Sequence, residues 1–571
     1  MKRTIVSFSL LAWLAPVCAQ QLATKWQLIT DSISAFGSPV AQDLNFDGVK
    51  DIVLGCGLEL SPSQYGVLAV DGASGDLLWH FPASSQVFTQ PLFLDLTGDG
   101  IAEVLIGGRN AQFWAINGAT GQLVWEFFPS GQGNPADSGW YNFYSPQWLP
   151  DLTGDSLPEI LISNGGDATA TIADTLRSEG SLLVLDVSDG SIVARDTMPD
   201  GKETYFSPLL IPSSDPLDPW ILFGSGGEVV HGSLWKSKLS WLLTDQLELA
   251  LPLLSGKGKG FVSAASLADL SGDGVEDVIV SRHNGGVVAY DWAGDRQLWE
   301  VTYPGHEPYV SPSIGQFTGS STPDVLVYMQ QGAWPIYFGG FFVLIDGATG
   351  QVVWTRTTET YQFASPNALD SDLDGFDEIL FVHNFYEDRP GPVRVFRHAV
   401  ELYDFQSDQT QVLSPIRDGM DVFSTALLTD LDQNGRLDFV YAANNNTEGW
   451  YQSDGITLSR TELSGVGTNV AWGGYLGNAG NGRYELRLIS DVGDIHSLEV
   501  KVFPNPATQE MWVHTDPFWQ DGSIELLDLT GRLVRSTKES HINLEGVADG
   551  TYLYRINLTG KTATGKVIIR R

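Results

Sequence analysis

Short apolar runs recur along the chain, and each follows directly on a polar stretch that contains acidic or turn-forming residues. Ile379-Leu380-Phe381-Val382 is one such run, and Ile221-Leu222-Phe223 and Val325-Leu326-Val327 are others. Runs of this length, bounded by turn residues, are typical of strands that are buried on both faces. No convincing helical periodicity lies between them. The pattern predicts an all-β chain in which each buried strand is introduced by a loop.

The stretch before Ile379 shows what the acidic loops share. Asp370-Ser371-Asp372-Leu373-Asp374-Gly375-Phe376-Asp377-Glu378 places acidic side chains at relative positions 1, 3, 5 and 9, with Gly at position 6 for a sharp turn. A hard cation such as Ca²⁺ takes oxygen ligands at this kind of spacing from a short loop, and position 7 would supply a backbone carbonyl. We therefore expect a calcium site formed by Asp370, Asp372, Asp374 and Glu378. Acid that only confers solubility would explain the charge but not the spacing.

The same unit occurs at five other places, where Asn, Ser or Thr replaces an acid at some positions. The candidate calcium ligands in these copies are Asp43, Asn45, Asp47 and Asp51; Asp95, Thr97, Asp99 and Glu103; Asp151, Thr153, Asp155 and Glu159; Asp269, Ser271, Asp273 and Asp277; and Asp430, Asp432, Asn434 and Asp438.

The spacing of the copies predicts how many units the chain holds. They start at 43, 95, 151, 269, 370 and 430, so two of the gaps are about twice the others. Each long gap contains a degenerate copy, Pro212–Trp220 and Gln316–Asp324, and a ninth, weaker unit runs through residues 477–485. A period near 55 residues with about four short strands fits the blade of a propeller. We predict a β-propeller of eight blades, with seven or nine left open because the ninth unit can be a patch on the ring.

Two further features repeat with the loops. A Ser-Pro step, as in Ser38-Pro39 and Ser365-Pro366, precedes each of several predicted innermost strands, where proline costs no ladder hydrogen bond. A hairpin with two glycines and a final Trp, as in residues 70–79, 116–125 and 345–354, supplies a tight turn between strands. We interpret the Trp as an anchor between neighbouring blades, and a sugar-stacking role is the less favoured alternative. A lone strand near Trp26 to Thr30 is expected to complete the last blade.

Residues 36 to about 490 resemble bacterial propellers built of FG-GAP or VCBS-type repeats, with quinoprotein-like hairpins mixed in. The six near-complete loops carry this resemblance. It implies Ca²⁺ in the loops and a propeller fold. It also implies adhesion, glycan or protein binding, or a scaffolding role beside enzymatic domains.

The N-terminus has the pattern of a secretory signal. Lys2 and Arg3 precede an apolar run, and Val17-Cys18-Ala19 forms a small-residue cleavage site before Gln20. A lipoprotein anchor on Cys18 is disfavoured by the residues that precede it. No later stretch is long and apolar enough to span a bilayer. The formal charge of −37, which becomes −39 without Lys2 and Arg3, argues against nucleic acid and anionic membranes as partners.

Residues 500–571 break the period and predict a small β-sandwich. The opening Pro504-Asn505-Pro506, the turn Leu529-Thr530-Gly531-Arg532, the strand Gly550-Thr551-Tyr552 and the basic last strand resemble the type A sorting domain of the type IX secretion system of Bacteroidota. The resemblance implies recognition by the type IX translocon and sorting machinery after passage through the periplasm. Cleavage near residue 500 would then release the propeller or attach it to the outer-membrane surface.

These features divide the chain into a signal peptide at 1–19, a β-propeller at 20–499 and a sorting domain at 500–571. We find no hydrolase or metalloprotease motif, and no Cys/Cys metal spacing. His283 and His383 are interpreted as solvated loop residues.

Three aromatic or Gly-rich insertions are the better places for a binding site, namely 131–142, 329–342 and 384–392. We expect a binding or adhesion module for a glycan or protein rather than an enzyme. The alternative is an extracellular carbohydrate-active lyase or hydrolase built on the ring.

Overall fold

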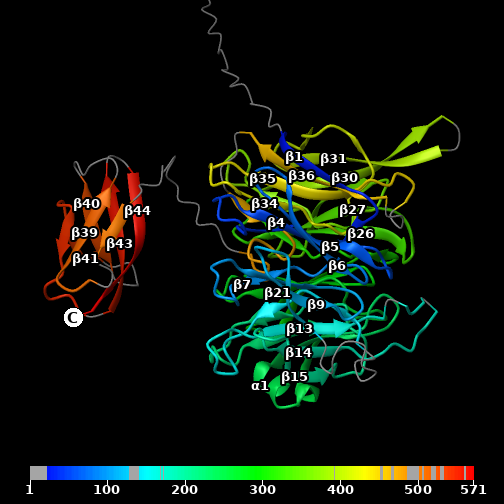
Figure 1. Cartoon of the computed structure of the whole chain (residues 1–571), viewed down its shortest axis with the longest axis horizontal. Helices are drawn as coiled ribbons and strands as arrows, with labels where there is room; N and C mark the ends of the chain where they lie inside the picture. The colour runs from blue at the N-terminus through cyan, green and yellow to red at the C-terminus, as the bar shows by residue number, and fades with distance from the viewer. Residues whose placement is uncertain are drawn as a thin grey trace, which may run out of the picture. The chain divides into compact units, whose positions relative to one another are not determined.

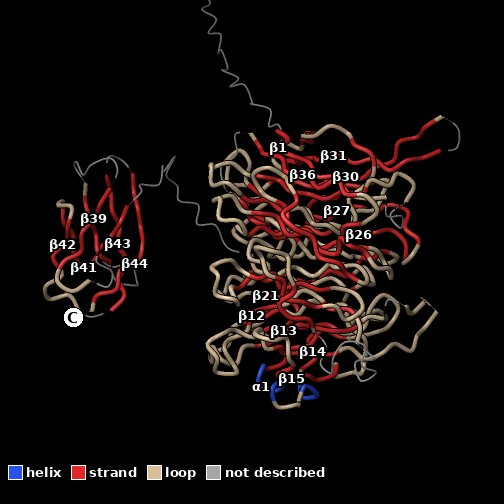
Figure 2. Tube along the Cα trace, viewed as in Figure 1, coloured by secondary structure: helices blue, strands red, loops and turns tan. Residues whose placement is uncertain are grey.

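The computed structural model shows an almost entirely β-stranded chain (Figure 2). Contacts divide it into two compact units, Met1–Arg487 and Leu488–Arg571. The structure describes residues 22–127, 140–167, 169–171, 173–390, 393–449, 454–464, 469–484, 500–503, 507–515, 522–527, 533–548, 550–558 and 561–570. The predicted signal peptide at 1–19 lies outside these residues. None of the helices in the described parts of the chain has the length and apolar composition needed to cross a bilayer.

The first unit contains eight antiparallel sheets, which we number as blades 1 to 8 in chain order (Figure 1). Blade 1 contains β2 (Ser34–Ala35), β3 (Val40–Gln42), β4 (Asp51–Gly57), β5 (Ser63–Val70) and β6 (Leu77–Ala83). Blade 2 contains β7 (Leu92–Leu94), β8 (Glu103–Gly107), β9 (Phe113–Ile116) and β10 (Leu123–Glu126). Blade 3 contains β11 (Asn142–Phe143), β12 (Gln147–Trp148), β13 (Ile160–Gly165), β14 (Ser181–Leu185) and β15 (Ile192–Thr197). Blade 4 contains β16 (Leu209–Ile211), β17 (Trp220–Gly224), β18 (Ser233–Lys238) and β19 (Leu251–Ser255), with α1 (Leu239–Leu243) and the 3₁₀ turn η2 (Leu247–Leu249) inserted before β19.

The second half of the ring repeats this plan. Blade 5 contains β20 (Ser266–Ala268), β21 (Asp277–Arg282), β22 (Gly286–Asp291) and β23 (Arg296–Thr302). Blade 6 contains β24 (His306–Glu307), β25 (Ser313–Gly315), β26 (Asp324–Ala333), β27 (Ile336–Ile345) and β28 (Val352–Thr358). Blade 7 contains β29 (Asn367–Leu369), β30 (Glu378–Arg389), β31 (Val393–Asp404), β32 (Gln409–Val412) and β33 (Arg417–Asp418). Blade 8 contains β34 (Leu427–Thr429), β35 (Asp438–Asn444), β36 (Ile456–Leu463) and, from the N-terminal end, β1 (Leu22–Thr30).

The fold is therefore a β-propeller, and it has the eight blades that the loop spacing favours. Both degenerate loops lie where a blade needs one, between β16 and β17 and between β25 and β26. The lone N-terminal strand completes blade 8 as predicted, because β1 pairs antiparallel with β36 from Leu22↔Leu463 to Thr30↔Ile456. The two ends of the propeller sequence are thereby hydrogen-bonded into one sheet, which closes the ring.

Burial along each blade explains the hydrophobic pattern. The second strands β4, β8 and β21 are buried at every residue, because neighbouring blades cover both of their faces. The outer strand β15 alternates between half-buried and exposed positions. Continuous apolar runs therefore mark the middle of a blade, and alternating runs mark its rim.

The recurring Trp of the hairpins joins one blade to the next. Trp79 Nε1 of blade 1 donates to the Gly118 carbonyl of blade 2 at 2.6 Å, and Trp26 Nε1 of blade 8 donates to the Gly72 carbonyl of blade 1 at 2.7 Å. The turn glycine opposite must stay small, since a Cβ on Gly121 would lie 2.8 Å from the Trp79 side chain. Gly121 also has a φ of +70°, which other residues rarely adopt. The predicted inter-blade anchor is confirmed by these contacts.

The ninth unit is no blade but a segment that crosses the inner strands. A short strand just before it, β37 (Val470–Trp472), pairs with β29 of blade 7. Farther along, the Gly480 carbonyl accepts from Gln147 Nε2 of blade 3, and the Gly482 carbonyl accepts from the Leu267 amide of blade 5 at 2.7 Å. We call residues 470–484 the crossing segment. It bridges blades that are not neighbours, so it patches the centre of the ring.

The second unit forms two sheets around one core. The first sheet contains β38 (Val500–Phe503), β39 (Glu510–Thr515) and β42 (His541–Asn543), and the other contains β40 (Ser523–Leu527), β41 (Leu533–Thr537), β43 (Gly550–Leu558) and β44 (Lys561–Ile569). Met511 and Ile542 from the first sheet share a buried cluster with Ile524, Ile556 and Val567 from the second. This is the small β-sandwich predicted for the tail, although the predicted Pro504-Asn505-Pro506 and the whole turn at 529–532 lie outside the described residues.

We expect the Trp anchors to dominate the stability of the seams between blades. Trp79→Ala should cost about 3–5 kcal/mol in the free energy of unfolding, because a large buried side chain is lost. Trp79→Phe should cost about 1–2 kcal/mol, because the buried Gly118 carbonyl loses its donor. The urea unfolding midpoint measures both effects. Leu78→Ala is the control, since the Leu78 side chain is exposed and its removal should have little effect. Equal midpoints for Trp79→Ala and Leu78→Ala would reject the anchor role.

Candidate metal loops and central pocket

All six predicted loops lie between the first two strands of a blade and share one backbone conformation. The residue at position 4 has a positive φ in each, including the non-glycine residues Phe46 (61°), Leu373 (63°) and Gln433 (55°). Position 6 also has a positive φ in each loop, whether it is glycine or Ser156 (75°). Such angles cost an ordinary residue on the order of 1 kcal/mol. The shared strain indicates that the loop geometry is imposed by the contacts that its acids make.

Those contacts follow one scheme, which the loop of blade 2 illustrates. The carboxylate of Asp95 at position 1 accepts the amides of Gly98 and Gly100 at 2.7 and 3.0 Å. Asp99 at position 5 accepts the amide of Ile101 at 2.8 Å, and Glu103 at position 9 accepts the amides of positions 2 and 3. The acids therefore fold the loop around their own oxygens.

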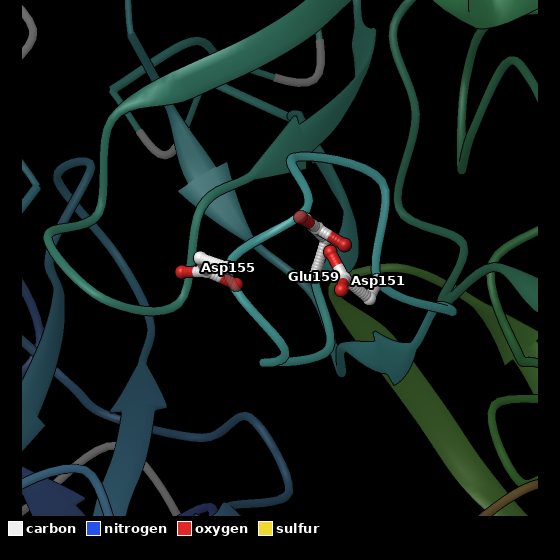
Figure 3. Close-up of side chains that lie close together, drawn as sticks. All are labelled: Asp151, Asp155 and Glu159. Atoms are coloured by element: carbon white, nitrogen blue, oxygen red, sulfur yellow. The ribbon is translucent and has the colours of Figure 1, made fainter.

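The structure brings three of the predicted carboxylates close together in three of the six loops, whereas the acids in the loops of blades 1, 2 and 5 form no such group among the described residues. Three carboxylates have oxygens within 4.8 Å of one another in the loops of blades 3, 7 and 8, namely Asp151, Asp155 and Glu159; Asp370, Asp372 and Asp374; and Asp430, Asp432 and Asp438. Figure 3 shows the first of these groups, carried by the loop before β13. In all six loops the carboxylate at position 9 is at most 2% exposed. Oxygen-only donor sets with a buried carboxylate fit a hard cation.

Burial raises the pKa of several position-9 carboxyls. The pKa of Asp51 rises to about 6 and that of Glu378 to about 8, and the pKa of Asp277 also rises. In each case burial outweighs the hydrogen bonds from the loop, which act in the opposite direction. The protein alone thus leaves the charge of these groups incompletely compensated.

A second candidate site lies at the other end of the inner strands. It is a pocket of about 290 Å³ at the centre of the ring, lined by residues from all eight blades. Its wall comes from the residues just before the innermost strands, such as Phe36 before β3 and Phe363 before β29, whereas the acidic loops follow those strands. Tyr475 of the crossing segment also lines it, with its hydroxyl 3.5 Å from Ser207 Oγ.

Serine and threonine hydroxyls connect neighbouring blades around this pocket. The Thr425 amide of blade 8 donates to Ser38 Oγ of blade 1, and the Ser365 amide of blade 7 donates to Thr425 Oγ1, both at 3.1 Å. The Ser145 amide of blade 3 likewise donates to Ser207 Oγ of blade 4. These are the residues of the predicted Ser-Pro steps and their counterpart in blade 8. The steps therefore set the start of each inner strand and its contact with the next blade.

One side of the pocket is aromatic. Phe36 stacks on Phe423, and Phe423 stacks on Phe363, with ring centroids 5.2 and 4.5 Å apart. Tyr309 and Trp334 extend this cluster, and Trp334 comes from the predicted insertion 329–342. Side chains with charged or amide groups line the rest, and these are Glu59, Arg109, Asn142, Asp167, Arg177 and Glu228. Ser263 Oγ, also in the lining, has no hydrogen-bond partner within the described part of the chain.

The three predicted insertions contribute unequally. From 131–142, residues 131–139 lie outside the described residues, Asn142 lines the pocket, and Trp140 packs against Phe127 and under the Arg195 guanidinium instead. In the third insertion, Tyr386 packs beside the aromatic cluster. The pocket as a whole was missed at the sequence level, although aromatic residues ahead of the Ser-Pro steps were a usable signal.

His283 and His383 are not the solvated loop residues that we expected: His283 lies in a turn but is buried, and His383 lies in a strand. His283 is fully buried, and its Nε2 lies 3.3 Å from Glu307 Oε2. His383 lies within β30, with its Nδ1 2.7 Å from Glu401 Oε1. His383 follows its apolar run because β30 continues through it, whereas His283 lies in the buried turn after β21, and the partner of each is distant in the sequence.

Glu307 links His283 to the pocket through two tyrosines. The Tyr337 hydroxyl donates to Glu307 Oε2 at 2.6 Å and contacts the Tyr309 hydroxyl at 2.7 Å, and Tyr309 donates to Glu228 Oε1 at 2.9 Å. Burial alone would raise the pKa of Glu307, but His283, Lys259 and Tyr337 hold it at about 2. An ionised buried carboxylate thus orients the hydroxyls behind the pocket wall.

Glu203 is a second buried carboxyl behind the wall. It is fully buried, its Oε2 accepts the hydroxyl of pocket-lining Tyr205 at 3.2 Å, and its Oε1 has no partner among the described residues. Burial raises the pKa of Glu203 to about 7, against the opposing effect of Arg177. Burial therefore favours the protonated form of this carboxyl beside the pocket.

Two family models match parts of the chain. Residues 501–570 match the secretion system C-terminal sorting domain, and residues 60–205 match the outer membrane protein assembly factor BamB, a family of propeller-type repeats. The first match confirms the sorting domain predicted from the tail and indicates secretion. The second supports propeller repeats, while the FG-GAP or VCBS resemblance stays a prediction. A comparison with curated proteins finds no match.

Several solved structures are similar to the chain at low identity. They include the quinohemoprotein alcohol dehydrogenase ADHIIG from Pseudomonas putida HK5 (12% identity, 84% of this chain and 79% of that chain, TM-score 0.47). A europium-containing methanol dehydrogenase (10%, 77% and 93%, 0.48) and the exotype rhamnogalacturonan lyase YesX (13%, 77% and 74%, 0.46) are others.

We expect Glu203 to make stability fall as pH rises. Its pKa is raised by folding from an ordinary value of 4.5 to about 7, so the folded protein holds the proton more tightly than the unfolded chain. The contribution of Glu203 to the free energy of unfolding is fully present below pH 4.5 and is lost by about pH 7. The whole contribution amounts to roughly 3 kcal/mol. Urea unfolding at pH 4.5 and 7.5 should show this decrease, and Glu203→Gln should shrink it. An unchanged difference in Glu203→Gln would refute the assignment.

Proposed function

We propose that this protein is an exported, calcium-stabilised propeller that binds a glycan in its central pocket. The sorting domain indicates secretion. We further propose that residues 1–19 are removed as a signal peptide, and that the type IX translocon and sorting machinery recognise residues 500–571. Processing near residue 500 then leaves a mature propeller of 20–499, either released or attached to the outer-membrane surface.

The proposed role of calcium is structural. In the loops of blades 1, 2, 3, 5 and 7, the ligands are the side chains at positions 1, 3, 5 and 9, such as Asp151, Thr153, Asp155 and Glu159. A divalent ion bound there supplies the positive charge that the converging carboxylates require. Position 9 is the first residue of the second strand or immediately precedes it, so an ion at this point holds the loop to the core of the blade.

Removal of calcium should lower the melting temperature markedly. Extracellular sites of this chemistry often bind Ca²⁺ with dissociation constants of about 10⁻⁴ to 10⁻³ M, so the protein should melt highest in millimolar calcium and lowest in chelator. Magnesium at the same concentration is the control, since it requires a stricter octahedral geometry and binds such loops poorly. An unchanged melting temperature on addition of chelator would reject the structural role of the ion.

The observation that carries the glycan proposal is the two-sided lining of the pocket. Ligand sites combine apolar and aromatic walls with a few polar groups that fix orientation. A sugar ring has an apolar face that can lie on Phe36, Phe363 or Trp334, and hydroxyls that can bond to both acceptors and donors. Glu228 and Arg177 are an acceptor and a donor in the lining. A protein ligand, the other class expected from the sequence, would present a single side chain to a pocket of this size.

We expect Trp334→Ala to weaken glycan binding by at least about tenfold, because it removes a stacking surface from the pocket wall. A glycan array followed by titration calorimetry on the best ligand measures the effect. Phe338→Ala is the matched control, since Phe338 lies on the same hairpin, is 71% exposed and is not part of the lining. Equal binding by both variants, or a wild-type protein that binds proteins but no glycan, would contradict the proposal.

The second candidate function is a carbohydrate-active enzyme, and Glu203 is the observation that favours it. A buried carboxyl with a pKa of about 7 that is hydrogen-bonded to pocket-lining Tyr205 has the protonation behaviour of a general acid. Incubation of the protein with polysaccharides should then give new reducing ends or unsaturated products, and Glu203→Gln should abolish them. Binding without turnover favours the binding module.

A further inference from the structure

The acidic loop of blade 8 differs from the other five because an arginine guanidinium is already paired with its carboxylates. Arg460 of β36 is only 1% exposed. Its Nε donates to Asp438 Oδ1 at 2.8 Å, and one terminal nitrogen donates to Asp438 Oδ2 at 2.9 Å and to Asp432 Oδ2 at 2.7 Å. Two of the four candidate calcium ligands of this loop are thus held by a fixed cation.

Strand register shows that this arrangement is specific to blade 8. Arg460 faces Val440, which is two residues after the position-9 acid Asp438. The residues at the corresponding register in the other five acidic-loop blades are all apolar, and they are Ala69, Ala115, Val184, Ala289 and Leu402. Those blades have no basic side chain at this point of the sheet.

Arg460 also reaches across the seam at which the ring closes. Its remaining terminal nitrogen donates to the Gly72 carbonyl of blade 1 at 2.8 Å. The same carbonyl accepts Trp26 Nε1 from β1. Beside it, the Lys50 amide of blade 1 donates to the Leu431 carbonyl, the second residue of the blade 8 loop. The guanidinium therefore joins the acids of the last blade to the hairpin of the first.

We propose that Arg460 replaces the calcium ion in blade 8 and makes the closing seam independent of metal. A planar guanidinium matches two carboxylates and a carbonyl with fixed geometry and stays charged at any physiological pH. An ion at this loop would have to displace it and leave a buried charge unpaired, which is strongly unfavourable. This inference rests on the proposed calcium role of the other loops. The closing seam then needs no ion, whereas the ions stabilise blades 1, 2, 3, 5 and 7.

The number of bound ions tests the proposal. Equilibrium dialysis of residues 20–571 in millimolar calcium, followed by elemental analysis, should give five ions per chain, one for each acidic loop without a guanidinium. Six ions would overturn the replacement by Arg460. No bound ion at all would instead overturn the calcium role of the loops, so the two failures are distinguishable.

A matched pair of substitutions locates the difference. Asp374 and Asn434 occupy position 5 of their loops, and each accepts the amide of position 7 at 2.8 Å, so Asp374→Ala and Asn434→Ala remove the same loop contact. Asp374→Ala should lose one ion, and Asn434→Ala should lose none. Loss of an ion in Asn434→Ala would contradict the proposal.

Arg460→Met provides the converse test. It should gain one ion in the dialysis experiment, and its melting temperature should depend more steeply on calcium than that of the wild type. Arg436→Met is the control, since Arg436 is exposed and pairs with Glu462 of the same blade rather than with a loop carboxylate. An unchanged ion count in a folded Arg460→Met would refute the inference. If Arg460→Met does not fold, the ion count of the wild type and the position-5 pair decide the question.

Discussion

The structure depends on a buried carboxylate at the start of the second strand of six blades. Such a group is stable only when donors or cations surround it. The amides of loop positions 2 and 3 supply part of this, which forces the loop into a conformation that even Phe46 and Leu373 adopt at positive φ. The remaining negative charge is stabilised by a cation. In blade 8 that cation is part of the chain, namely the guanidinium of Arg460. The proposed ions and the guanidinium thus have the same role, which is to compensate the charge of the buried carboxylate.

The ring keeps the acidic loops apart from the pocket. The acidic loops follow the innermost strands, and the pocket residues precede them, so the two sets lie at opposite ends of these strands. Trp anchors and the shared sheet of β1 and β36 hold the blades in register, and the pocket needs that register because each blade contributes only two to five of the lining residues. A change in Trp334 leaves the Trp anchors and the hydroxyl contacts between blades in place, because Trp334 takes part in neither. This arrangement suits a scaffold that presents different ligand sites on one stable frame.

Much of the fold could be predicted from the sequence because each blade repeats its own local chemistry. The loop spacing predicted eight blades, and the lone strand near Trp26 predicted how the ring is closed. The hairpin Trp predicted the anchors between neighbouring blades. The pocket could not be predicted, since it joins residues as distant as Phe36 and Phe423, which meet only once the ring is closed. The same applies to His283 and Glu307 and to Arg460, whose partners lie on other strands. Periodicity reveals what repeats, whereas these contacts occur once.

A crystal structure of the mature propeller grown with calcium tests the central claim most directly. The account predicts one ion in each loop of blades 1, 2, 3, 5 and 7, at about 2.3–2.6 Å from the oxygens at positions 1, 3, 5 and 9. Loops that stay closed on their own hydrogen bonds, with no ion among the carboxylates, would contradict it.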